Sequence, residues 1–301
     1  MSDDLDEESM RSELEKAVGQ QGEVVMPSDA RAPILTAPVR ASLQQWMFEM
    51  NSVDDLLAVG LKPRQRALLS GPPGCGKTTL AHHICARLGI PMLVVHSHEL
   101  LSKYVNQSGE QIGKLFRMAR KSQYGIALFF DEFDALAKSR EGMGGQAADN
   151  ERANITIALL QEFDRYDGLL FAATNVTKTI DAAIWRRFEM QIEIGFPGVA
   201  ERFAIVKMYL APFQADDVTI TALSAAFAGA SPALIQQGCE AIKRSLVLGP
   251  KMNLPTDLAA IMDRFKASSS PADGQDLPRL WSHPRGALMA LAKAPWPPVL
   301  P

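Results

Sequence analysis

The segment GPPGCGKTT, residues 71–79, contains the residue types that most clearly indicate chemistry. Its spacing G-x-x-x-x-G-K-T lies between a strand-like run and a helix-like run, which is the usual context of a phosphate-binding loop. Glycines let backbone N–H groups close on phosphates, and the following helix N-terminus adds a favourable dipole. We expect Lys77 to reach the β- and γ-phosphates of a nucleoside triphosphate and Thr78 to bind Mg²⁺. The residues expected to bind nucleotide in this loop are Pro73, Gly74, Cys75, Gly76, Lys77, Thr78 and Thr79.

Two adjacent carboxylates, Asp131 and Glu132, follow the apolar run 126–130. Ligands of open α/β sheets bind at the carboxyl ends of the strands, so Asp131 is placed to hold Mg²⁺ through water. Glu132 is placed to orient and polarise an attacking water. Because a chain that only bound nucleotide would not need Glu132, hydrolysis is favoured. Asn175 ends the run 169–174 at the same edge, where its amide can hydrogen-bond the γ-phosphate and the water.

Strand-like and helix-like runs alternate around these residues, which predicts an α/β fold with a parallel sheet covered by helices on both faces. The five expected strands are 66–70, 91–95, 126–130, 169–174 and 190–194. From residue 197 the pattern becomes all-helical, with helix-like runs at 199–210, 219–228, 231–247 and 255–266.

The expected organisation has four parts. Residues 1–33 are polar and acidic and are expected to form a flexible arm. Residues 34–196 form the large nucleotide-binding domain, and 197–266 form a small all-α lid domain. Residues 267–301 are rich in Pro, Ser and Gly and are expected to form a loose tail.

Composition excludes several classes of protein. The net charge of −3 gives no bulk electrostatic reason to bind nucleic acid or an anionic membrane. The three cysteines form no C-x-x-C pair, and the acidic N-terminus has no apolar segment like that of a signal peptide. No apolar run approaches the length of about 18 residues needed to span a membrane. We therefore expect a cytoplasmic protein without a membrane span.

The motifs GPPGCGKT, LFFDEFDAL, AATN and IDAAIWRRFEMQIEI occur in the order and spacing of the AAA clade of the AAA+ ATPases. Residues 34–247 resemble this clade, which includes katanin and spastin. The resemblance implies a P-loop domain of the ASCE type with a helical lid, ATP and Mg²⁺ as cofactors, and a homo-oligomeric six-membered ring. It also implies that ATP hydrolysis remodels, unfolds or disassembles a protein partner.

The resemblance assigns further roles to residues of this chain. Arg186 and Arg187 match the arginines that such proteins insert into the neighbouring subunit's site. Lys103, Tyr104 and Val105 match the pore loop, in which the aromatic ring grips an extended polypeptide.

Two positions near these motifs differ in how well they match the clade. Asn106 stands where the clade usually has glycine, so the flexibility of the pore loop is in doubt. Gly60, with Val59, matches the segment that contacts the adenine.

Two alternatives remain open. One is a nucleotide-gated adaptor that regulates a separately encoded effector, such as a protease or a signalling enzyme. Retained function in a Tyr104→Ala variant with intact ATPase would favour it. The other is a nucleic-acid-acting AAA+ protein such as a helicase loader, which stimulation of the ATPase by DNA would favour.

Overall fold

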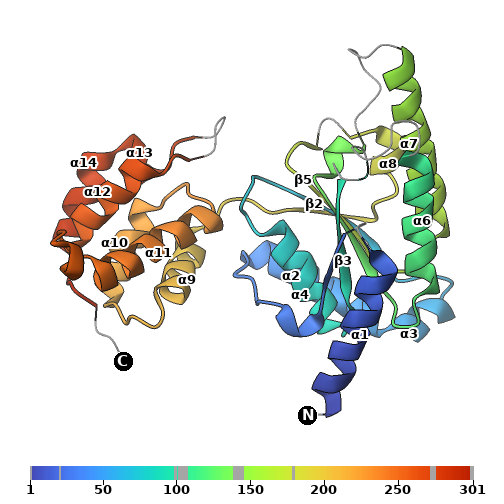
Figure 1. Cartoon of the computed structure of the whole chain (residues 1–301), viewed down its shortest axis with the longest axis horizontal. Coiled ribbons are helices and arrows are strands. Elements are labelled where there is room, and N and C mark those ends of the chain that lie inside the picture. Colours follow the sequence, from blue (N-terminus) through green and yellow to red (C-terminus); the bar gives the residue numbers. More distant parts are fainter. Residues whose placement is uncertain are drawn as a thin grey trace. The chain divides into compact units, whose positions relative to one another are not determined.

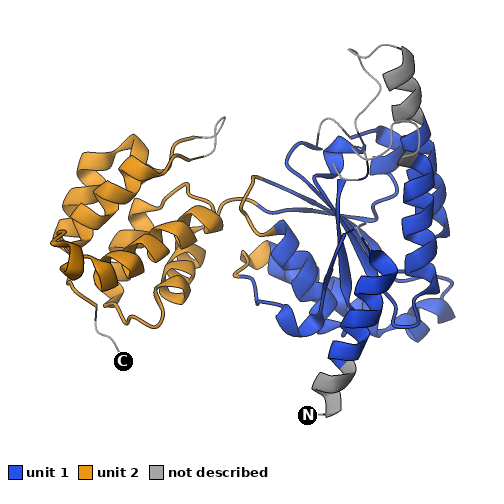
Figure 2. Cartoon of the chain, in the orientation of Figure 1, with its two compact units in different colours: residues 1–33, 39–71, 77–194 blue, residues 34–38, 72–76, 195–301 orange. Residues whose placement is uncertain are grey.

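The computed structural model describes residues 2–19, 22–97, 100, 108–137, 146–177, 180–271 and 276–298. They fall into two compact units (Figure 2). Unit 1 comprises Met1–Pro33, Val39–Gly71 and Lys77–Ile194. Unit 2 comprises Ile34–Pro38, Pro72–Gly76 and Gly195–Pro301, so it takes two short segments from within the first third of the chain. Among the described residues, no helix combines the length and apolar character needed to cross a membrane.

Unit 1 contains a six-stranded sheet with the order β1-β3-β4-β5-β2-β6. The strands are β1 (Glu23–Val25), β2 (Arg66–Ser70), β3 (Met92–His96), β4 (Ala127–Asp131), β5 (Leu170–Thr174) and β6 (Met190–Glu193). Neighbouring strands from β2 to β6 pair in parallel, and β1 pairs antiparallel to β3. The predicted α/β class is confirmed, and each of the five predicted strands lies within one residue of its expected bounds.

Helices cover both faces of this sheet (Figure 1). In chain order the helices that lie wholly or mainly in unit 1 are α1 (Ser2–Val18), η1 (Pro27–Asp29), α2 (Ala37–Asn51), α3 (Val53–Ala58), α4 (Lys77–Arg87), α6 (Ser108–Lys121), η2 (Phe133–Ala135), α7 (Gln146–Arg165) and α8 (Ala182–Trp185). Helices α6 and α7 lie side by side on one face, and α2 and α4 lie on the other.

Alternation along the strands explains why both faces are apolar. Successive strand residues point to opposite faces. Phe130 stacks on Phe116 of α6, with ring centroids 5.8 Å apart. On the other face Phe171 meets Trp46 of α2 edge-on at 5.6 Å. Each face of the sheet is therefore buried, as a parallel sheet requires.

The N-terminal segment differs from the flexible arm that the sequence predicted. It forms α1, β1 and η1, and β1 extends the predicted five strands to six. Leu14 and Val18 of α1 are buried in the core of unit 1, and Met26 is fully buried. A three-residue strand has no measurable periodicity, and its pairing with β3 is a tertiary contact that composition cannot reveal.

Unit 2 is helical. Its helices are α9 (Val199–Leu210), α10 (Asp217–Ala226), α11 (Pro232–Leu248), η4 (Pro250–Met252), α12 (Leu258–Ser268), α13 (Arg279–Ser282) and α14 (Pro284–Ala292). The expected loose tail is wrong for α13 and α14, because Leu280, Ala287 and Leu291 are buried in the unit's core. The content of Pro, Ser and Gly led to that error, yet proline is well tolerated in the first turn of a helix, where Pro284 lies.

Candidate nucleotide site

The loop after β2 has a backbone that only glycine allows at its first position. Gly71 has a φ of +144°, and a Cβ there would lie 2.1 Å from the carbonyl oxygen of Ile194. Gly74 and Gly76 also have positive φ values, +73° and +91°. The loop therefore turns sharply at the carboxyl end of the sheet and leads directly into α4, as a phosphate cradle requires.

Lys77, the first residue of α4, ties this loop to the neighbouring strand. Its Nζ donates to the carbonyl oxygen of Gly71 at 2.8 Å and to Oδ1 of Asn175 at 2.7 Å. Lys77 is 9% exposed, so its ammonium group has a defined position. Two residues predicted from separate motifs, Lys77 and Asn175, are thus brought into contact.

The turn after β4 holds the two predicted carboxylates in an uncommon conformation. Glu132 has φ 49° and ψ 43°, the left-handed region, and its N–H donates to Oδ1 of Asp131 at 2.9 Å. Non-glycine residues in this region cost about 1–3 kcal/mol and cluster at active sites. Asp131 is half-buried and Glu132 is exposed at the carboxyl end of the sheet. Ser97, just after β3, donates to the carbonyl oxygen of Asp131.

A buried hydroxyl joins the ends of β4 and β5. Thr174 is 1% exposed, and its Oγ1 donates to Oδ1 of Asp134 at 2.9 Å. The same Oγ1 accepts from the N–H of Val176 at 3.0 Å. Asp134 belongs to η2, which directly follows Glu132, and Asn175 lies between Thr174 and Val176. The two turns that carry Glu132 and Asn175 are therefore coupled, a link that the sequence reasoning missed.

The residues at this edge fit a magnesium nucleotide. Thr78 is an exposed residue in the first turn of α4, and Asp131 supplies a carboxylate. The described residues contain no group of three or more His, Cys, Asp or Glu side chains able to hold a metal alone. Mg²⁺ usually takes one or two protein oxygens and completes its shell with phosphate and water, so this donor set suits it.

The other loop residues differ in their exposure. Cys75 is buried, at 7% exposed, and therefore packs within the protein. Pro73 and Thr79 are exposed.

The adjacent arginines after α8 have different surroundings. Arg187 is half-buried, pairs with Asp164 at 3.3 Å and donates to the carbonyl oxygen of Ala183 at 3.2 Å. Arg186 is exposed, and within the described part of the chain its side chain has no hydrogen-bond or ion-pair partner. Arg187 is held by its own chain, whereas Arg186 is available to another molecule.

The predicted adenine residue Gly60 is not brought to this edge. Gly60 follows α3 and precedes Gln65, whose carbonyl oxygen accepts from the N–H of Leu170 at the amino end of β5. The length of β2, about 16 Å at 3.3 Å per residue, separates that end from the phosphate loop. Figure 1 shows α3 and α8 at opposite ends of the sheet. Lys103, Tyr104 and Val105 lie outside the described residues.

Within unit 2, the segment Pro72–Gly76 contacts α11, a contact that the sequence did not reveal. The N–H of Ala233, in the first turn of α11, donates to the carbonyl oxygen of Gly74 at 3.2 Å. A Cβ at Gly74 would lie 2.9 Å from Cβ of Ala233, so glycine permits this approach. The segment Ile34–Pro38 also belongs to unit 2, and Ile34 packs against the hydrophobic core of that unit.

Comparison with known proteins agrees with this geometry. Residues 67–196 match the family described as "ATPase family associated with various cellular activities (AAA)". An "Uncharacterized AAA family ATPase y4kL" of Sinorhizobium fredii is 39% identical over 204 residues, 66% of this chain and 59% of that protein. A "Proteasome-activating nucleotidase" of Aeropyrum pernix is 32% identical over 231 residues, 72% of this chain and 55% of that protein.

The match to an "ATP-dependent zinc metalloprotease FtsH 4" of Sphaerobacter thermophilus is 33% identical and covers 68% of this chain but only 33% of that protein. The chain thus spans between a third and three-fifths of the length of these relatives. The family match includes the end of β2, the phosphate loop, Asp131, Glu132, Asn175 and both arginines. The chain therefore carries an ATPase domain of the AAA family.

Proposed function

We propose that this chain hydrolyses ATP with Mg²⁺, assembles into a homo-oligomeric six-membered ring, and uses the hydrolysis to remodel, unfold or disassemble a protein partner. The observation that carries the proposal is the contact of Lys77 with Asn175 at the edge where β4 presents Asp131 and Glu132. Phosphate binding, metal binding and water activation each need one of these groups, and all come from strands that end at the same edge.

The residues divide the work of hydrolysis. Thr78 and Asp131 would hold Mg²⁺, which would supply neutralisation of charge on the phosphates. Lys77 exchanges its hydrogen bonds to Gly71 and Asn175 for phosphate oxygens, because an ammonium group binds a phosphate more strongly than a neutral amide. That exchange leaves Oδ1 of Asn175 able to orient the attacking water. Glu132 takes up the developing proton of that water.

The proposal of a site shared between subunits and the proposal of a protein substrate are supported by different observations. The exposed Arg186 has the chemistry to stabilise a phosphoryl group bound by a neighbouring copy. The names of two relatives, a proteasome-activating nucleotidase and an ATP-dependent metalloprotease, indicate work on proteins for those relatives. By extension, Lys103, Tyr104 and Val105 of this chain would contact an extended polypeptide in the centre of the ring.

Replacing Glu132 by Gln tests the hydrolysis step. The variant is expected to bind ATP as tightly as the natural chain and to turn it over at least about 100-fold more slowly, because it lacks the base. Phosphate release measures turnover, and fluorescence of a labelled ATP analogue measures binding. Glu15→Gln, at an exposed position of α1, is the matched control and should leave both unchanged.

Full turnover in Glu132→Gln would show that this carboxylate is not the base. If the variant behaves as expected, it also becomes a trap, since it should remain in its ATP-bound state. A pull-down with this trap in ATP should retain the protein client, and the same experiment in ADP should release it.

A further inference from the structure

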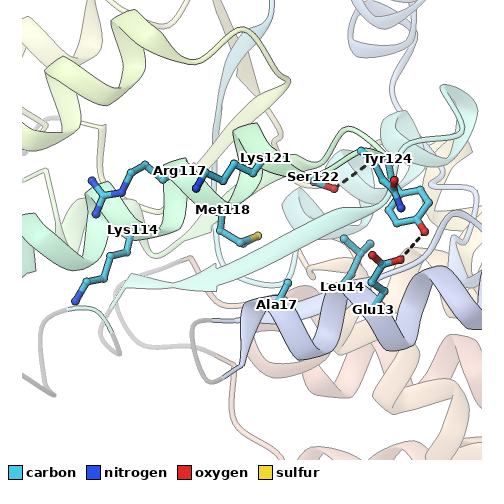
Figure 3. Close-up of a pocket in the computed structure, with 10 residues that line it drawn as sticks. Glu13, Leu14, Ala17, Lys114, Arg117, Met118, Lys121, Ser122 and Tyr124 are labelled. Atoms are coloured by element: carbon cyan, nitrogen blue, oxygen red, sulfur yellow. Dashed lines mark hydrogen bonds between the residues drawn. The ribbon is translucent and has the colours of Figure 1, made fainter.

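A pocket of about 570 Å³ lies between α1 and α6, both in unit 1 (Figure 3). Its volume falls within the range of roughly 300–1,000 Å³ that is typical of ligand sites. It lies away from the residues of the nucleotide site, and neither the phosphate loop nor the turn after β4 contributes to its lining. Its wall depends on α1, the helix formed by the acidic N-terminal segment.

Three cations from one helix line this pocket. Lys114, Arg117 and Lys121 recur at intervals of three and four residues on α6, which places them on one face of the helix. Lys114 pairs with Glu110 on its own helix at 2.9 Å. Arg117 and Lys121 are exposed, and no side-chain hydrogen bond or ion pair joins either of them to another described residue.

The rest of the pocket is apolar or already paired. Met118, Leu14 and Ala17 line it between the two ends, and Met118 is half-buried. At the far end Tyr124 donates its hydroxyl to Oε2 of Glu13 at 2.6 Å. Figure 3 shows this pair at one end, Lys114 and Arg117 at the other, and Met118 and Ala17 between them. The lining therefore contains three cations and one carboxylate, which accepts the hydrogen bond from Tyr124.

We propose that this pocket binds a short acidic peptide segment of a partner protein, with an apolar side chain next to its carboxylates. The guanidinium of Arg117 suits a carboxylate because its donors form a planar fork that can bind both oxygens. Met118 and Ala17 would cover the apolar side chain, and methionine adapts to side chains of different shape. Arg117 and Met118 are neighbours on α6 and Ala17 lines the same pocket from α1, so both anchors fit one short segment.

A nucleic acid fits this surface less well than a peptide. The cations extend over eight residues of α6, a rise of about 10 Å for seven steps of 1.5 Å, which covers only a few phosphates. Helix α1, which forms the opposite wall, carries exposed acidic residues, among them Glu8 and Glu15, and they repel a longer polyanion.

The chain's own acidic segment is also a poor occupant. Glu7 accepts the hydroxyl of Ser28 at 2.7 Å, and Arg11 pairs with Asp29, so the first half of α1 is held to its own unit. An acidic segment from a different protein is therefore the better match.

Fluorescence anisotropy with a labelled pentapeptide, Asp-Glu-Leu-Asp-Glu, tests the proposal on the full chain without nucleotide. We expect saturable binding that weakens between about 0.05 M and about 0.5 M salt, because screening reduces contacts between exposed charges. The Lys114→Ala/Arg117→Ala variant should bind at least about tenfold more weakly, since charge-assisted hydrogen bonds are lost. Peptides with Ser in place of Leu, or with Asn and Gln in place of the acids, should also bind more weakly.

The matched control is Lys62→Ala/Lys251→Ala, which removes the same charge at exposed positions outside the pocket and should bind the peptide like the natural chain. Circular dichroism melts show whether each variant is folded. Absence of binding at millimolar peptide would overturn the proposal, and so would equal losses in the two double variants. Stronger binding of single-stranded RNA at the same cations would reject a peptide. A zero-length cross-link from Lys114 to residues 3–8 of a second copy would reject a partner protein.

Because this experiment omits nucleotide, its result does not depend on whether the ATPase proposal holds.

Discussion

Arg186 and Arg187 are neighbours in sequence, but only one is tied to its own chain. Arg187 pairs with Asp164 on the surface of unit 1, and such partly exposed pairs contribute about 0–1 kcal/mol to stability. We expect Arg187→Ala to lower the melting temperature slightly. Arg186→Ala should leave the melting temperature unchanged and lower the ATPase rate by about 10³-fold or more, as for other arginine fingers. Full ATPase activity in both variants would contradict a site shared between subunits.

Asp134 and Thr174 form the contact that positions Glu132 relative to Asn175. We expect Asp134→Ala and Thr174→Val to lower kcat by about 10- to 100-fold with little change in KM, because a misplaced catalytic group affects the chemical step more than binding. Asp134→Asn keeps an oxygen that can accept the Thr174 hydroxyl, so it should restore most of kcat. Equal loss in Asp134→Asn and Asp134→Ala would assign the carboxylate a different role.

Sequence spacing predicts which residues would carry the chemistry, but it does not show how they meet. Lys77, Asp131 and Asn175 follow predicted strands, so a parallel sheet brings them to one edge. The hydrogen bond from Thr174 to Asp134 joins residues 40 positions apart, and no local pattern reports it. The left-handed backbone of Glu132 was equally hidden, because glutamate has no intrinsic preference for it.

At the scale of elements, a helix or strand could be predicted only where its sequence has a clear apolar pattern. Strands β2 to β6 are apolar runs bounded by polar turns, and all five were predicted. Strand β1 and helix α14 were missed because one is three residues long and the other lies in a segment rich in proline. Gly60 was expected near the adenine from resemblance alone, and it lies at the amino end of the strands.

The connection between α2 and β2 predicts a pH dependence of stability. Arg64 donates to both carboxylate oxygens of Glu49, through Nε at 2.9 Å for one of them, and its carbonyl oxygen accepts from Trp46 Nε1 at 2.7 Å. The side-chain hydrogen bond from Arg64 lowers the pKa of Glu49 below its ordinary value of 4.5, although burial opposes this. The pair therefore stabilises the fold fully above pH 4.5, and this contribution is lost as pH falls through the lowered pKa.

Glu49→Gln should accordingly lower the free energy of unfolding by about 1 kcal/mol at pH 7, a value reduced by the partial exposure of the pair. The difference from the natural chain should narrow as the pH falls below about 4.5. Urea unfolding at a series of pH values measures it, with Glu15→Gln as the control for loss of an exposed carboxylate. A difference that stayed constant with pH would show that the charge of Glu49 is not what stabilises this connection.

At the scale of the whole molecule, the phosphate loop belongs to two units at once. Lys77 lies in unit 1, whereas Pro72–Gly76 lies in unit 2 and contacts the N-terminus of α11. The division could not be predicted from the sequence, because a boundary placed at residue 197 follows the chain rather than the contacts.

If active sites are shared between subunits of a ring, a mixture of two inactive variants should regain ATPase activity, which neither variant could show alone. Chains with Glu132→Gln lack the base but still supply Arg186, whereas chains with Arg186→Ala keep the base and lack the arginine. A 1:1 mixture of these two inactive variants should recover about a quarter of the natural ATPase rate, because random assembly pairs an intact base with a neighbour's intact arginine at about that fraction of sites. Phosphate release from the mixture measures the recovery.

The control for this mixture is Arg186→Ala mixed with a chain that carries both substitutions. It contains the same number of intact bases but no intact arginine at position 186, so it should recover nothing. No recovery in the first mixture, with both variants shown to co-assemble by light scattering, would mean that Arg186 acts within its own chain or not at all. Recovery in the control would instead show that exchange restores the fold of a damaged variant, because no complete site can form there.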